Sequence, residues 1–217
     1  MGVPGGPPVP QTVAVADDGL VVEWVPPGSP SRVAAEDFGR ALATMHGSRP
    51  ASYGADADGF IATLPLDNAP HDDWPTFYAE RRVRPFLTAL SAADRRPVEE
   101  LCHRIADVAG PAEPPARVHG DLWSGNLLWG AEGRVWLVDA ASAHGGHRET
   151  DLAMLHLFGA PHLDVTVAAY DEFAPLSPGW RRRLPLHQVH PLLVHATLFG
   201  GGYGRRAAEA AIAALHA

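Results

Sequence analysis

The segment VHGDLWSGNLLW, residues 118–129, constrains this chain more than any other part of its sequence. Asp121 follows a His-Gly pair, and Asn126 stands five positions later, directly before the apolar run Leu127–Trp129. The letters GAEGR then give a turn, and VWLVDA gives a second apolar run, which reaches Asp139. Two such runs around a glycine-containing turn predict an antiparallel β-hairpin.

A hairpin folds back on itself, so the end of its second strand lies beside the start of its first. We therefore expect Asp139 to lie next to Asn126, with Asp121 just upstream. Carboxylate and amide oxygens of this kind suit Mg²⁺, which takes one or two carboxylates plus phosphate oxygens. In the protein-kinase template an Asp orients the nucleophilic hydroxyl, an Asn five residues later holds one metal, and a later Asp holds the other. The order and spacing here match that template and predict phosphoryl transfer with ATP and Mg²⁺.

An Asp-x-x-x-x-Asn spacing taken alone also fits a turn residue and a strand cap that stand together by chance. The His-Gly pair, the hairpin and the Asp at its end together favour the metal-binding interpretation. We expect His119 to hold the backbone of the loop and not to act as the base, because Asp121 is better placed for a hydroxyl. Trp123 fits a position facing the cleft as well as a position in the core.

Charge and composition exclude several classes of partner. All 17 basic residues are arginine, and the formal net charge is −8, which argues against nucleic acid as the main partner. No apolar run reaches the roughly 20 residues that a membrane-spanning helix needs, so no membrane association is expected. The single cysteine, Cys102, cannot form an internal disulfide, which fits a reducing cytoplasm.

The remaining pattern predicts a mixed and mainly helical protein. Residues 11–25 indicate two short strands around the turn Asp17-Asp18-Gly19, and residues 47–74 indicate a loop. Helices are expected over residues 31–46, 75–90 (with a kink at Pro85) and 94–109, and over most of the chain after the motif.

Two polar features follow the hairpin. His144 and His147 have an H-x-x-H spacing, but no third ligand stands nearby in the sequence, so a structural or substrate-facing role is favoured over zinc. Asp151 falls in the first turn of an expected helix, where a negative charge is favourable.

Several stretches resemble the fructosamine kinase family, also called ketosamine kinases, which are relatives of the aminoglycoside and choline phosphotransferases in the protein-kinase-like superfamily. The resemblance runs from about Val9 to Gly204, and HGDLWSGN together with GGHRETDLAM separates this family from its aminoglycoside-phosphorylating relatives. The stretches that carry it are DGFIATLPLDN, DWPTFYAERRVRPFL, HGDLWSGNLLW, VWLVDAASAHGGHRETDLAMLHLFG and LLVHATLFGGGYG.

The resemblance implies a role for each residue of the motif. Asp121 is implied to be the catalytic base, or the group that orients the sugar hydroxyl, and Asn126 and Asp139 are implied to hold Mg²⁺. Trp123 is implied to lie over the sugar or its amine substituent. The segment around Asp151 is implied to brace the catalytic loop.

The resemblance also implies the reaction and its partners. The backbone of Glu23, Trp24 and Val25 is implied to be the hinge that meets the adenine of ATP. The implied reaction is ATP-dependent phosphorylation of a ketosamine, such as a fructosamine or ribulosamine, on a protein or a free amine. The phosphorylated adduct then breaks down spontaneously, which would make the reaction a deglycation repair of glycated proteins or small ketosamines.

The implied fold is α+β and protein-kinase-like, with most of the N-lobe missing. Residues 1–25 correspond to a remnant of the N-lobe sheet and the hinge, and residues 26–217 to a helical C-lobe with the catalytic loop at 118–139. Kinase-like folds carry a Gly-rich loop and a strand-borne Lys in the first N-lobe strands, and neither is expected here. The unpaired strand edge within residues 12–25 is a possible route to oligomers.

Two departures from the family pattern bear on activity. Asp139 is followed by Ala140 where the family usually has Pro, a small change because Pro affects backbone stiffness rather than ligation. The missing Gly-rich loop and Lys allow three explanations: the chain is part of a longer product, an inactive remnant, or a degenerate kinase that binds without chemistry. An aminoglycoside-type phosphotransferase is a weaker alternative, because this chain ends in the Ala-rich RRAAEAAIAALHA and not in a segment suited to polycationic drugs.

Overall fold

The computed structural model describes residues 2–17 and 19–217. Its α-helices are α1 (Arg32–His46), α2 (Trp74–Phe77), α3 (Ala92–Val108), α4 (Glu149–Phe158), α5 (Leu163–Phe173), α6 (Trp180–Phe199) and α7 (Tyr203–Leu215). The strands of the described residues pair antiparallel in twos: β1 (Thr12–Ala16) with β2 (Gly19–Val22), β3 (Gly59–Ile61) with β4 (Leu64–Leu66), β5 (Ala116–Val118) with β8 (His144–Gly146), and β6 (Leu127–Trp129) with β7 (Val135–Leu137).

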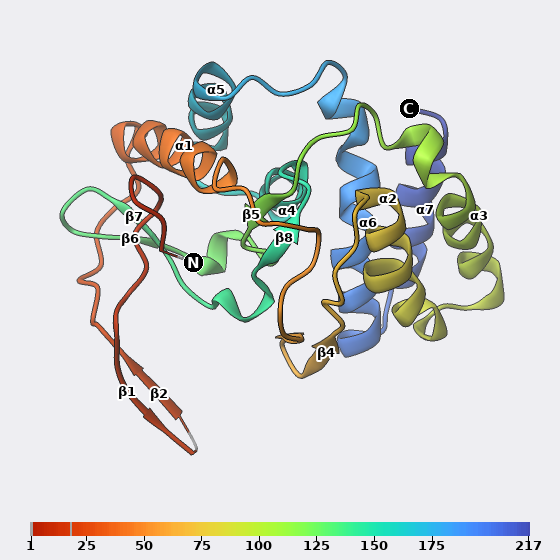
Figure 1. Ribbon diagram of the computed structural model, residues 1–217, viewed down its shortest axis with the longest axis horizontal. Helices are drawn as coiled ribbons and strands as arrows, with labels where there is room; N and C mark the ends of the chain where they lie inside the picture. Colours follow the sequence, from red (N-terminus) through yellow and green to blue (C-terminus); the bar gives the residue numbers. More distant parts are fainter. Residues whose placement is uncertain (1, 18) are drawn as a thin grey trace.

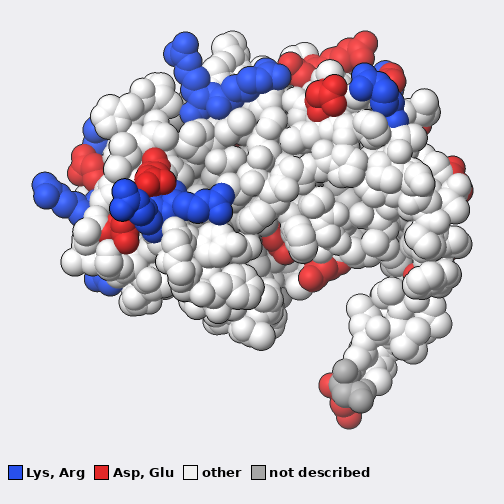
Figure 2. Space-filling view, turned by 180° about the vertical axis from the view of Figure 1, so that it is seen from behind, with Lys and Arg blue, Asp and Glu red and all other residues white. Residues whose placement is uncertain are grey.

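The β1–β2 hairpin projects away from the rest of the molecule (Figure 1). Its strands pair as the sequence predicts, with Val15 opposite Leu20, whereas the expected turn includes Asp18, which lies outside the described residues. Every residue of the two strands is exposed, and Val13 and Val15 are 68% and 77% exposed. The strands carry no charged residue, so the projection is almost uncharged apart from its tip (Figure 2). This hairpin is an apolar surface with two unpaired edges.

We expect the chain to self-associate through this hairpin. Replacing Val13 and Val15 together by Thr is expected to weaken self-association about tenfold, because less apolar surface would be buried. Sedimentation velocity over a concentration series measures the change. Val33→Thr is the matched control, since Val33 is 70% exposed but lies on α1. A monomer at all concentrations, or an equal effect of the control, would contradict the expectation.

Serine caps set the starts of two helices. The Ser31 hydroxyl accepts a hydrogen bond from the Ala34 N–H, so α1 begins at Arg32 and ends at His46, as predicted. The Ser91 hydroxyl does the same for the Asp94 N–H, and α3 therefore begins at Ala92, two residues before the expected start.

The prediction of a loop over residues 47–74 is wrong in part, because this segment contains the β3–β4 hairpin. Ile61 and Leu66 are buried and hold the hairpin to the body of the protein. The turn between the strands contains Ala62 at φ +51°, a left-handed conformation that glycine or asparagine usually supplies. The sequence therefore lacks the usual hairpin signal at this turn.

The helix expected over residues 75–90 is present but changes type along its length. Asp73 caps the short helix α2, a π-helical segment covers Tyr78–Val83, and a 3₁₀ segment covers Arg84–Ala89. Pro85 has no N–H to donate, and the change to 3₁₀ geometry occurs around it.

The buried side chains form two clusters, and Leu122 and Leu127 of the motif belong to the second. One cluster joins α2, α3, α6 and α7, and the other joins α1, α4, α5 and the β6–β7 hairpin. Helices α4 and α6 pack against each other and so link the two clusters. Among the described residues, no helix has both the length and the apolar character that crossing a membrane requires.

Candidate active site

The three polar side chains of the motif line one cavity. Asp121, Asn126 and Asp139 all border a cavity of about 270 Å³. In the β6–β7 hairpin Leu127 lies opposite Leu137, and the Val138 N–H donates to the carbonyl oxygen of Asn126 at 3.1 Å. The hairpin therefore brings the residue after its second strand to the start of its first, and the predicted convergence of the three side chains is confirmed.

Asp139 has an unusual backbone conformation for its position. It lies at φ +56° and ψ +60°, a left-handed region that few residues other than glycine, asparagine and aspartate adopt. Such a conformation costs free energy and is often found at functional sites. Asp139 also lines a second cavity of about 440 Å³, which lies between the β1–β2 hairpin and β7.

His119 is fully buried and connects the loop to the hairpin. Its Nε2 lies 2.8 Å from the carbonyl oxygen of Val138, so this nitrogen carries the proton. Its Nδ1 is then an acceptor, and the Asp121 N–H donates to it at 3.3 Å. Both ring nitrogens are used within the protein, which leaves Asp121 as the group that faces the cavity.

Asp151 lies beneath the same loop and accepts three hydrogen bonds. Its carboxylate receives the backbone N–H groups of His119 at 2.8 Å and Gly120 at 3.0 Å, and its Oδ2 lies 3.0 Å from Nε2 of His46. Burial alone would raise the pKa of Asp151, but the hydrogen bond from His46 and the nearby His119 hold that pKa below its ordinary value. A buried carboxylate thus holds the backbone just before Asp121.

Gly120 allows the loop to pass close to its neighbour. Its φ is +82°, and a Cβ atom built there would lie 2.3 Å from the carbonyl oxygen of Ser142. Any larger residue would push the loop away from the hairpin.

The orientation of Asn126 leaves one oxygen for a ligand. Its Nδ2 donates to the carbonyl oxygen of Asp121 at 2.8 Å and to the Asp121 carboxylate at 3.2 Å. The amide oxygen is therefore the atom that remains for a metal, beside the carboxylate of Asp139. One amide oxygen and one or two carboxylates on a single cavity fit the hard oxygen ligands that Mg²⁺ prefers.

The environment of Asp121 disfavours its negative charge. Burial raises the pKa of Asp121 above its ordinary value, and the nearby Asp139 acts in the same direction, whereas His119, Asn126 and His195 oppose the shift. A carboxylate that is held partly out of water and beside another carboxylate is suited to accept a proton.

Asp121→Asn is expected to raise the free energy of unfolding at about pH 8. A carboxyl group with a raised folded-state pKa costs no stability below its unfolded pKa, where both states are neutral, and costs stability above its folded pKa, where it is charged. The gain should therefore shrink toward zero at about pH 3.5. Urea unfolding at the two pH values measures it, with Asp107→Asn on the exposed face of α3 as control. A loss of stability at pH 8, or a gain that is independent of pH, would contradict the prediction.

Trp123 faces the cavity. Its side chain is 41% exposed, lines the cavity of the three polar residues, and meets Phe158 edge-on at a centroid distance of 6.3 Å. A Cβ atom on Gly125 would lie 2.3 Å from the Trp123 ring, so glycine at this position leaves room for the ring against the loop. The structure favours the cleft-facing position over the core position.

The opposite wall of the cavity is apolar and comes from segments that the motif does not contain. Its side chains come from the β3–β4 hairpin, α4 and α6, and include Ile61, Met154, Phe158, Val194, His195, Leu198 and Phe199. His195, which the sequence places as an ordinary helix residue, has Nδ1 at 2.8 Å from the carbonyl oxygen of Pro191. That nitrogen carries the proton, so Nε2 of a neutral ring is an acceptor. Nothing in the local sequence pattern shows that His195 lies across from Asp121.

The segment Glu23–Val25 does not line the cavity of the three polar residues. The Glu23 N–H donates to the carbonyl oxygen of Gln11 at 2.8 Å and closes the base of the hairpin. Trp24 is 79% exposed and Val25 is buried. The segment directly follows Val22, which lines the second cavity beside Asp139.

His144 and His147 have different partners and do not form one site. The Nδ1 of His144 bonds to the carbonyl oxygen of Ser142, whereas His147 lies with Glu149 and His187 in a buried group whose ligand atoms are within 4.8 Å of one another. The sequence spacing could not show this group, because His187 comes from α6. Both carboxylate oxygens of Glu149 already accept hydrogen bonds from Arg183, which neutralises the only anion and favours a structural ion pair over a metal.

Comparison with known proteins identifies similar sequences and folds. A family model described as fructosamine kinase matches residues 8–216. A protein of Thermus thermophilus named a probable ketoamine kinase is 39% identical over 200 residues, which are 90% of this chain and 71% of that protein. The crystal structure of a protein assigned as a fructosamine-3-kinase from Thermobifida fusca has 50% identity and a TM-score of 0.93, and the match covers 97% of this chain and 75% of the other.

A more distant structure shares the fold alone. The crystal structure of a choline/ethanolamine kinase family protein from Mesorhizobium loti is 15% identical, with a TM-score of 0.60 over 96% of this chain and 79% of the other. The kinase-like α+β fold expected from the sequence is therefore confirmed.

Proposed function

This chain belongs to the fructosamine kinase family, and we propose that it uses ATP to phosphorylate a ketosamine sugar, free or attached to a protein. The observation that carries the proposal is the convergence of Asp121, Asn126 and Asp139 on one cavity that Trp123 also lines. Phosphoryl transfer needs positioning, neutralised phosphate charge and a group that orients the hydroxyl, and this set of side chains can meet those needs. Breakdown of the phosphorylated adduct would then release the free amine.

We assign Asp121 to the substrate hydroxyl. Its raised pKa and its place on the cavity wall suit a group that orients the hydroxyl and receives its proton. Asn126, through its amide oxygen, and Asp139, through its carboxylate, are the residues that would hold Mg²⁺. When bound, the ion neutralises charge on the phosphates of ATP.

We assign the second cavity, next to Asp139, to the nucleotide. Its walls include Leu20 and Val22 of the β1–β2 hairpin and Leu137 of β7, an apolar setting that suits a purine ring. The backbone of Glu23–Val25, at the end of that hairpin, is the proposed hinge. The chain has no lysine, so any side-chain cation that it offers to the phosphates must be arginine or histidine.

Trp123→Ala is expected to raise the KM for the ketosamine about tenfold and to change kcat little. The exposed ring offers an apolar face to the sugar or its amine substituent, and losing that contact weakens binding in the ground and transition states alike. Steady-state kinetics measures the split between KM and kcat. Trp136→Ala is the control, because Trp136 lies in the β6–β7 hairpin, which directly follows the loop of Trp123, but does not line the cavity. An unchanged KM for Trp123→Ala would contradict the assignment.

A phosphotransfer assay tests the proposal. The chain is incubated with Mg²⁺-ATP and fructosyl-glycine, and ³¹P NMR follows ADP and the sugar phosphate. The proposal predicts both products, and predicts that glycine in place of the ketosamine gives neither. Fructosyl-glycine that binds in calorimetry but yields no ADP would instead support the non-catalytic kinase-like alternative, which the absence of a lysine favours.

A further inference from the structure

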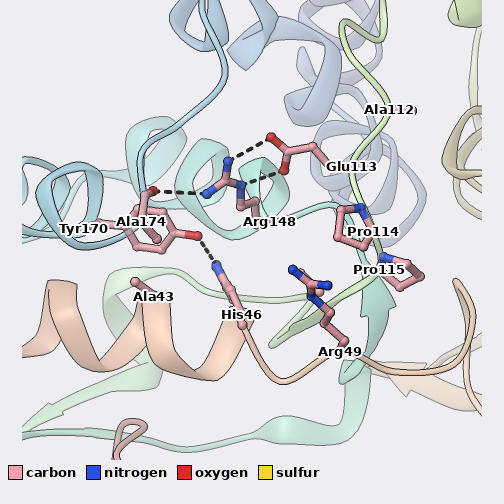
Figure 3. A pocket seen from close by; sticks show the side chains of 12 residues that line it. Ala43, His46, Arg49, Ala112, Glu113, Pro114, Pro115, Arg148, Tyr170 and Ala174 are labelled. Atoms are coloured by element: carbon pink, nitrogen blue, oxygen red, sulfur yellow. Dashed lines mark hydrogen bonds and ion pairs between the residues drawn. The ribbon is translucent and has the colours of Figure 1, made fainter.

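A separate cavity opens at the ends of α1, α4 and α5 (Figure 3). It has a volume of about 330 Å³ and shares no lining residue with the cavity of the three polar residues. Its walls come from the segment after α1, the segment before β5, the start of α4 and the end of α5. This volume is at the lower end of the range for small-molecule sites.

Two arginines line this cavity, and only one of them has an acidic partner among the described residues. Arg148 forms a two-pronged ion pair with Glu113, with Nε–Oε2 at 2.6 Å and Nη2–Oε1 at 2.8 Å. Two further N–H groups donate to the carbonyl oxygens of Ala174 and Pro175, so four of its five N–H groups are used and its charge is paired with Glu113. Arg49 also lines the cavity, and it has no acidic partner within residues 2–17 and 19–217. In Figure 3 its side chain reaches toward the cavity between His46 and Pro115.

The walls around Arg49 combine rigid apolar surface with polar groups. Pro114, Pro115 and Ala43 supply the apolar part, and proline holds its backbone in a fixed conformation. One unpaired guanidinium beside such walls suits a ligand with one anionic group and a small apolar body, because Arg binds carboxylate and phosphate through paired N–H groups.

A chain of hydrogen bonds joins this cavity to the catalytic loop. Tyr170 at the cavity wall has its hydroxyl 2.8 Å from Nδ1 of His46. Nε2 of the same ring bonds to Asp151, which holds the backbone N–H groups of His119 and Gly120. Because the Asp151 carboxylate is an acceptor, Nε2 of His46 donates to it, and the other ring nitrogen, Nδ1, is the atom that contacts the Tyr170 hydroxyl.

We propose that this cavity binds a small organic anion, a carboxylate or a monophosphate ester, through Arg49, and that the bound anion stabilises the Tyr170–His46–Asp151 chain beneath the catalytic loop. The apolar body lies against Pro114 and Pro115. The binding does not depend on the proposed phosphotransfer, so it can be tested whether or not the chain is an active kinase.

Calorimetry with simple probes tests the binding step. Benzoate and phenyl phosphate separate the two kinds of anion, and benzamide is the uncharged analogue of benzoate. At least one of the two anions is expected to bind, with benzamide about tenfold weaker than benzoate if benzoate is the one that binds. Arg49→Met should weaken anion binding about tenfold, and Arg96→Met, an exposed arginine on α3, should leave it unchanged. Failure of both anions to bind, or equal binding by Arg49→Met, overturns the proposal.

Hydrogen exchange tests the connection to the loop. Saturation with the bound anion is expected to slow exchange of the His119 and Gly120 amides severalfold in the unmodified chain. Tyr170→Phe lacks the hydroxyl that contacts His46 and should abolish this slowing while anion binding remains. Unchanged exchange at these two amides in the saturated chain, or undiminished slowing in Tyr170→Phe, overturns the proposed connection.

Discussion

Asp121→Asn is expected to lower kcat for ketosamine phosphorylation by about 10²–10⁴-fold, the usual contribution of a positioned acid–base group. Asparagine keeps the shape of the side chain and can still accept the hydrogen bond from Asn126, which in the native chain reaches the Asp121 carboxylate at 3.2 Å. What it loses is the carboxylate that we propose accepts the proton of the substrate hydroxyl. Steady-state kinetics with saturating Mg²⁺-ATP and ketosamine measures the effect.

The control for this variant is its nucleotide affinity. Asn126 and Asp139 remain in place, so the Kd for Mg²⁺-ATP is expected to stay within about threefold of the native value. A kcat within about threefold of the native value would show that Asp121 does not serve the hydroxyl. A lost affinity for ATP would show that the residue acts on the metal instead.

Asp151→Ala is expected to lower the free energy of unfolding by about 3–5 kcal/mol, because removing one partner from a buried charged network leaves the others unsatisfied. The groups left without an acceptor are the backbone N–H groups of His119 and Gly120 and the Nε2 of His46. Urea unfolding measures the loss. Asp164→Ala is the control, since the Asp164–Arg32 pair is exposed and 3.8 Å apart and should contribute less than about 1 kcal/mol.

The stability lost in Asp151→Ala should depend on pH in a defined direction. A carboxyl group with a lowered folded-state pKa stabilises the protein above its unfolded pKa, and this stabilisation disappears as the pH falls through the folded pKa. Because the pKa of Asp151 is lowered, the gap between native chain and variant should be largest near neutral pH and should narrow in acid. A loss below about 1 kcal/mol at pH 7 would contradict the role of Asp151 as support of the loop.

The structural features that the sequence predicts correctly involve residues close together in the chain. Two apolar runs around a turn predict the β6–β7 hairpin. The hairpin in turn places Asp139 beside Asn126, so this prediction needs no contact between distant parts of the chain. The start of α1 likewise follows from the cap at Ser31. These features depend on hydrogen bonds between residues close in sequence, which residue type and spacing determine.

The features that the sequence does not predict depend on contacts between residues far apart in the chain. His46 and Asp151 are 105 positions apart. No periodicity in the sequence indicates that the last residue of α1 contacts Asp151, which holds the loop before Asp121. His195 reaches the cavity because α6 packs beside α4. The turn at Ala62 lacks the glycine that usually marks such a turn in a sequence. The turn forms because the packing of Ile61 and Leu66 outweighs the local preference of the backbone.

Calorimetric titration of Mg²⁺-ATP into the 217-residue chain and into its Asp139→Asn variant shows whether the three polar side chains hold the nucleotide and its metal. Asparagine tolerates the left-handed backbone of Asp139, so the substitution removes the carboxylate that we propose binds the metal and is expected to leave the fold intact. We expect saturable binding by the native chain and binding at least about tenfold weaker by the variant. No binding by the native chain, or equal binding by the two, would contradict the claim that Asp121, Asn126 and Asp139 form a working nucleotide–metal site.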